Sequence, residues 1–144
     1  MVWNRILGVL VGRDRTLTHR LSMLAFGIFL VTAGIAFVMR VTGIDAPLLW
    51  LTTGYNAIFL AILVTLLAGM SAYLNDGLLV SCALAFAPVF ALFLNYVGVG
   101  FIRKPTTMEF IGLAAAFGLL YTVPLGTLGF LLGTGIRRIS EFVK

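Results

Sequence analysis

Long apolar runs separated by short polar connections dominate the hydrophobic pattern of this chain. Four runs contain no Asp, Glu, Lys, Arg or His; they cover residues 21–39, 48–70, 78–101 and 110–132, with lengths of 19, 23, 24 and 23 residues. An α-helix rises about 1.5 Å per residue, so about 20 apolar residues cross the roughly 30 Å hydrocarbon core of a bilayer. Each run therefore predicts a transmembrane helix.

The connections between the runs carry residues that end one helix and begin the next. Gly43 follows the first run, and residues 75–77 (Asn-Asp-Gly) form a turn cluster between the second and third. Thr106 and Glu109 have capping-box spacing directly before the fourth run. Short connections make sequential helices antiparallel neighbours. The expected fold is therefore an all-α membrane protein, a four-transmembrane-helix bundle of up-down-up-down topology.

The first 20 residues follow a different pattern. Apolar residues recur on one helical face, and basic residues stand between them: Trp3, Ile6, Leu7 and Leu10 against Arg5, Arg13, Arg15 and Arg20. This pattern predicts a short helix lying in the headgroup region, where anionic lipid headgroups would be its partners; a partly ordered tail is the alternative. The expected organisation is an interfacial segment (1–20), a transmembrane domain (21–139) and a short C-terminal tail (140–144).

Composition excludes an ordinary water-soluble domain. Hydrophobic residues make up 61% of the 144 residues, charged residues only 10%, and the mean hydropathy is +1.12. Soluble domains average about 25% charged residues, so the lipid bilayer is the expected surrounding. The net charge of +5 comes from basic residues that flank the apolar runs. This placement favours lipid headgroups and topology over nucleic acid as its explanation.

The distribution of basic residues predicts the orientation in the membrane. Residues 1–20 contain four Lys or Arg and the C-terminus three, a total of seven on one side, whereas Arg40, Arg103 and Lys104 give three on the other. The positive-inside bias then puts both termini in the cytoplasm of a multi-pass cell-membrane protein. The preference for Arg, eight of ten basic residues, is typical of a prokaryotic protein.

Charged residues and histidine are absent from the four apolar runs. Asp, Glu, Lys, Arg and His side chains within a membrane mark proton relays, ion pathways and catalytic groups, and none of the runs contains one. Ser81 and Cys82 lack a neighbouring base, and the lone His19 lies far from Cys82 in the sequence. The sequence therefore predicts no enzyme, no catalytic residue, no cofactor and no metal site.

Amides and hydroxyls form the main polar candidates within the runs. Asn56 and Asn95 lie at nearly equal distances from the turn near Leu74, and Thr32 and Thr52 are expected at a similar depth. An amide facing hydrocarbon would be unpaired, so both asparagines are expected to face the interior and to approach within hydrogen-bonding range, with Thr32 beside them. The layer is interpreted as interhelical glue, with a small polar binding pocket as the alternative.

Small residues and prolines predict how the helices pack. Gly118, Gly126, Gly129 and Gly133 recur on one face of the fourth run, which indicates a helix-packing seam. Pro88 and Pro124 lie inside the third and fourth runs, where each removes a backbone N–H and predicts a kink.

Two function classes remain open from the sequence. The first is a small non-enzymatic membrane protein: an accessory or scaffold subunit of a larger membrane complex, or a homo-oligomeric bundle that organises the membrane. The tight seams and the absence of ionisable residues favour it. The alternative is a small oligomeric channel or transporter for a neutral or weakly polar solute, which the prolines and the asparagines would serve.

Overall fold

The structure is a computed structural model that describes residues 9–12, 14–43, 55–96 and 105–143. Within these ranges the chain is all-helical, as the apolar runs predict, and no strand is present. Four of the described helices are long and apolar enough to cross a membrane. They are α2 (Arg15–Thr42), α4 (Tyr55–Asn75), α5 (Leu78–Tyr96) and α6 (Thr107–Phe142).

Local capping explains where the helices begin and end. α2 begins at Arg15, within the predicted interfacial segment, because the Asp14 side chain accepts the N–H groups of Thr16 and Leu17. It ends at Gly43, whose φ of 72° suits the left-handed conformation of a helix end. The predicted capping box is confirmed: Thr106 and Glu109 bond reciprocally at the start of α6.

The α4–α5 turn is shorter than the predicted connection. Only Asp76 and Gly77 separate the two helices, and Asp76 has a positive φ of 52°. Asparagine and aspartate tolerate this region better than most residues because their short side chains can bond locally. The start of the second run, at residues 48–54, and the end of the third, at residues 97–101, lie outside the described residues.

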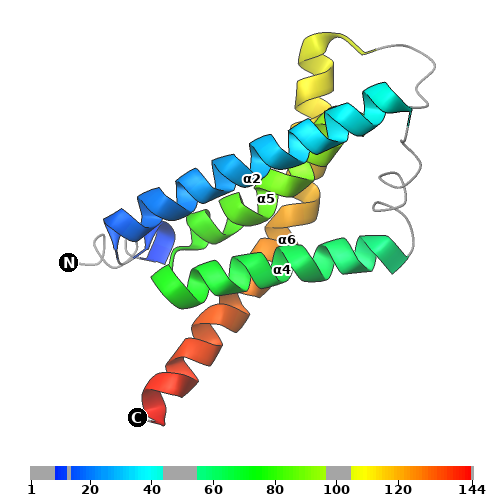
Figure 1. The fold of residues 1–144 in the computed structure, drawn as a ribbon. Helices are drawn as coiled ribbons and strands as arrows, with labels where there is room; N and C mark the ends of the chain where they lie inside the picture. Colours follow the sequence, from blue (N-terminus) through cyan, green and yellow to red (C-terminus); the bar gives the residue numbers. More distant parts are fainter. Residues whose placement is uncertain (1–8, 13, 44–54, 97–104, 144) are drawn as a thin grey trace.

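The helices are arranged around α5. α5 packs against α2, α4 and α6, and α6 also packs along α4, whereas α2 meets α5 and hardly touches α4. Figure 1 shows α2, α5 and α4 lying side by side, with α6 crossing them obliquely. More than half of the apolar window of α5 is buried, against less than a fifth of that of α2. The fold is therefore a packed α4–α5–α6 core with α2 attached along α5.

The interior and the outer surface are both apolar. Val64 of α4 and Leu84 and Val89 of α5 are among the largest fully buried side chains. Large apolar side chains are also exposed on the outer faces of all four helices, for example Leu30, Ile62, Leu79 and Leu131.

Candidate functional site

One face of α6 makes very close contacts with its neighbouring helices. All four predicted seam glycines are buried on it. A β-carbon placed on Gly129 would lie 2.5 Å from the carbonyl oxygen of Thr65 and 2.7 Å from the Cβ of Ala68, both in α4. A β-carbon on Gly133 would overlap the carbonyl oxygen of Gly69. The backbones of α4 and α6 therefore meet directly, which only glycine permits here.

The same α6 face meets α5 nearer its N-terminal end. A β-carbon on Gly126 would lie 3.1 Å from Sγ of Cys82, and one on Gly118 would lie 2.8 Å from the Phe86 ring. Because α6 crosses the bundle obliquely, a single glycine face serves two partner helices in turn (Figure 1).

Aromatic side chains hold α2 against α5. The Phe29 ring of α2 stacks on Phe90 of α5 with centroids 5.7 Å apart, and Phe90 stacks on Phe86 at 4.9 Å. Phe86 is also the ring beside Gly118 of α6. A row of aromatic rings thus runs from α2 through α5 to α6.

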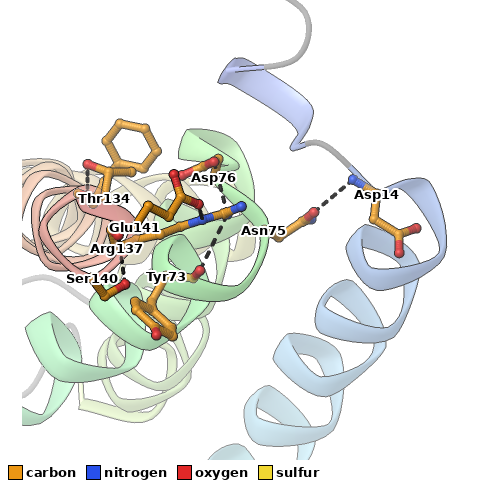
Figure 2. Close-up of polar contacts among 9 residues, drawn as sticks. Asp14, Tyr73, Asn75, Asp76, Thr134, Arg137, Ser140 and Glu141 are labelled. Atoms are coloured by element: carbon orange, nitrogen blue, oxygen red, sulfur yellow. Dashed lines mark hydrogen bonds and ion pairs between the residues drawn. The ribbon is translucent and has the colours of Figure 1, made fainter. Parts of the chain in front are cut away.

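A buried asparagine joins α2 to α4 at the end of the molecule that contains the α4–α5 turn, here called the hairpin end. Asn75 is 1% exposed. Its Oδ1 accepts the backbone N–H of Asp14 at 3.0 Å, as Figure 2 shows, and its Nδ2 donates to Oγ1 of Thr18 at 2.7 Å. Gly12, with φ of 103°, passes so close to Asn75 that a β-carbon would overlap it. The start of α2 is therefore fixed to the end of α4.

An ion-pair network ties the C-terminal part of α6 to the same end. Nη1 of Arg137 lies 3.0 Å from Oδ2 of Asp76, and its Nε lies 3.0 Å from Oε1 of Glu141. Nη1 also donates to the carbonyl oxygen of Tyr73 at 3.5 Å (Figure 2). Arg137 therefore links the α4–α5 turn to the last turns of α6.

The contact between Asn75 and the start of α2 was not predicted from the sequence. In the sequence, Asn75 was interpreted only as a turn residue, and Asp14 was assigned no role. The signal for Asp14 was present, since Asp directly before a helix is a preferred N-cap. The pairing of Asn75 with Asp14, 61 residues away, left no local signal.

The predicted polar layer is only partly described. Asn95 is 8% exposed, and its Nδ2 donates to the carbonyl oxygen of Ala91 in its own helix at 2.9 Å. Its backbone carbonyl accepts a 2.6 Å hydrogen bond from Arg40 of α2. Thr32 is half-buried on α2. The side chain of Asn56 and all of Thr52 lie outside the described residues, so the approach of Asn56 to Asn95 stays a prediction.

Both intrahelical prolines lie in continuous helices. Pro88 is buried in α5, and Pro124 is exposed on α6. Their predicted kinks stay predictions. Among the described residues, no group of three His, Cys, Asp or Glu side chains could hold a metal ion.

Two hollows between α4 and α6 form a lateral groove. Two adjoining parts, of about 360 and 380 Å³, share Thr65 and Leu66. Their lining is apolar apart from Thr65 and two tyrosines. A separate cavity of about 40 Å³ lies among Leu60, Val89, Leu92, Phe93 and Tyr121. These hollows are therefore bounded mainly by apolar side chains.

Comparison with known proteins gives a family. Neither the curated proteins nor the solved structures contain a match to this chain. The family model described as "Domain of unknown function (DUF8071)" matches residues 11–144, which is nearly the whole chain. The chain belongs to this family.

Proposed function

We propose that this protein is a non-enzymatic integral membrane protein that serves as an accessory or scaffold subunit, or as a membrane-organising oligomer. The exposed apolar surface is the observation that carries the proposal. Leu30, Ile62, Leu79 and Leu131 are each more than half exposed on four different helices. In water such a continuous apolar surface would drive aggregation, whereas hydrocarbon is a suitable solvent for it.

The spacing of polar anchors supports a membrane crossing. Arg20 and Arg40 on α2 are separated by about 30 Å at 1.5 Å per residue, which matches the thickness of a hydrocarbon core. Near them, Asn75 bonds at one end of α2 and Asn95 at the other. Successive helices reverse direction in Figure 1, which is compatible with alternating crossings.

Packing favours a scaffold over a transporter. The lateral groove opens sideways, where lipid or a partner helix would lie, and its lining is mostly apolar. Where Gly129 and Gly133 meet α4, the two backbones are too close for a solute to pass between them. The alternative is a channel for a neutral solute, which a flux measurement distinguishes from a scaffold.

Orientation is tested by labelling single cysteines with a membrane-impermeant maleimide in intact cells. In a Cys82→Ser background, Thr106→Cys and Ser140→Cys place the probe at opposite ends of α6. The positive-inside bias predicts labelling of Thr106→Cys alone until the membrane is opened. The reverse result would contradict the proposed orientation, and release of the protein by alkaline carbonate would contradict membrane integration.

Function is tested in proteoliposomes. Glycerol and urea fluxes are expected to equal those of protein-free liposomes, because a scaffold offers no path. Flux above that of the protein-free control would support the channel instead. Cross-linking in native membranes is expected to give a defined larger species, either a homo-oligomer or a complex with another protein.

A further inference from the structure

The acidic side chains of the hairpin end are engaged within the molecule. Asp14 caps α2 through the N–H groups of Thr16 and Leu17. Asp76 and Glu141 both lie 3.0 Å from nitrogen atoms of Arg137. These contacts leave little of the negative charge at this end to neutralise further cations.

Among the described residues, three arginines are exposed at the same end. Arg15 and Arg20 lie on the first turns of α2, and Arg138 lies on α6 beside the Arg137 network. Within the described ranges, the guanidinium groups of these three arginines form no hydrogen bond or ion pair with another residue. In contrast, Arg40 at the opposite end of α2 donates to the carbonyl oxygen of Asn95. Uncommitted positive charge therefore accumulates at the hairpin end.

The free arginines stand at the edge of the apolar surface. On α2, Arg20 is followed by Met23 and Leu24, which are 62% and 53% exposed. On α6, Arg138 is next to Ile139, which is 67% exposed. In a bilayer, a cation directly beside side chains that contact hydrocarbon lies at the depth of the lipid phosphates.

We propose that the hairpin end binds anionic phospholipid headgroups through Arg15, Arg20 and Arg138. The inference rests on the membrane location proposed above and adds a partner of defined chemistry. A guanidinium donates two parallel hydrogen bonds to phosphate oxygens, so arginine suits this ligand better than lysine. A juxtamembrane arginine favours an anionic over a neutral lipid surface by up to about fivefold, the factor equivalent to roughly 1 kcal/mol.

The test measures lipid selectivity directly. The full chain is reconstituted in phosphatidylcholine vesicles that contain a trace of spin-labelled phosphatidylglycerol or spin-labelled phosphatidylcholine. The fraction of motionally restricted label gives the preference of the protein boundary for each lipid. We expect the wild type to enrich phosphatidylglycerol severalfold and this enrichment to fall with added salt, since exposed charges are screened.

Matched variants assign the enrichment to the three arginines. The triple variant Arg15→Gln, Arg20→Gln, Arg138→Gln is expected to lose most of it, whereas Arg40→Gln is expected to keep it. Equal enrichment by the triple variant, or no preference in the wild type, would overturn the inference. If the triple variant does not fold, the single variant Arg138→Gln and the salt dependence of the wild type decide the question.

The outcome also separates this inference from the proposed function. A protein that enters phosphatidylcholine vesicles without lipid preference would refute the headgroup surface alone. A protein that does not enter the vesicles would refute the membrane location, and the headgroup surface with it.

Discussion

At the α4–α6 interface the two backbones touch, whereas at the α2–α5 interface phenylalanine rings keep them apart. Gly129 and Gly133 bring α6 against Thr65 and Gly69 of α4. Across the second interface, Phe29 stacks on Phe90. Both contacts lie between helices that are apolar on every side. Because lipid is as apolar as these helices, the hydrophobic effect does not select which helix faces pair. Complementary shape must then select the partner.

Hydrogen bonds to neighbouring helices support both α2 and α6. α2 is bonded at both ends: Thr18 to Asn75 of α4 at the hairpin end, and Arg40 to the end of α5 at the other. Between α6 and α4, the Tyr121 hydroxyl donates to the carbonyl oxygen of Ala57, and Arg137 donates to that of Tyr73. The end bonds of α2 therefore add to a single main packing contact with α5, whereas the hydrogen bonds of α6 add to glycine contacts with two helices.

The largest expected effect comes from filling the α4–α6 contact. Gly129→Leu would drive a side chain into the Thr65 carbonyl, and overpacking costs typically about 1–3 kcal/mol. We expect a clear fall in the free energy of unfolding in detergent. Gly135→Leu is the control, because a β-carbon at Gly135 meets nothing within 4 Å. Equal melting temperatures for the two variants would show that the α4–α6 contact is not close-packed.

Next in size is the loss of the buried asparagine. Asn75→Ala removes the acceptor for the Asp14 N–H and the donor to Thr18, and leaving buried polar groups unpaired costs about 1–3 kcal/mol. We expect faster hydrogen exchange in the first turns of α2, with little change in α6. Thr18→Val, which removes one of the two bonds, should have a smaller effect. Uniformly faster exchange in all helices would contradict the view that Asn75 acts mainly on α2.

A smaller effect is expected at the opposite end of α2. Arg40→Gln removes the hydrogen bond to the Asn95 carbonyl, and because Arg40 is exposed the loss should be about 0.5–1 kcal/mol. Hydrogen exchange at the end of α2 reports the change, and Arg40→Lys provides a variant that keeps the charge. If Arg40→Gln destabilised the protein more than Asn75→Ala, the hairpin end would not be the stronger of the two anchors.

The smallest effect should reverse its sign between two glycines of one helix. Gly→Ala in a helix interior commonly stabilises by roughly 0.5–1 kcal/mol, because alanine loses less backbone entropy on folding. Gly135→Ala, with open space around its β-carbon, is expected to raise the melting temperature slightly. Gly129→Ala is expected to lower it, since the β-carbon would lie 2.5 Å from a carbonyl oxygen. The same sign for both would remove the basis for treating glycine contact as the difference between the interfaces.

The sequence by itself determined the helices and several of their ends. Four uncharged runs predicted four long apolar helices, and Gly43 and the pair Thr106 and Glu109 predicted helix boundaries that the structure contains. These features are local: run length, capping spacing and left-handed glycine depend on residues a few positions apart. The glycine series of α6 was visible for the same reason, because it repeats along one helix.

Only the tertiary structure decided which surfaces meet. It divided the α6 glycines between α4 and α5, attached α2 along α5, and joined Asn75 to Asp14 and Arg137 to Asp76. Amphipathic helices carry a stripe that shows which side turns inward, but these helices are apolar all round. Their rotations and crossing angles therefore follow from the fit of side chains on helices far apart in the chain, which the order of residues along any one helix does not contain.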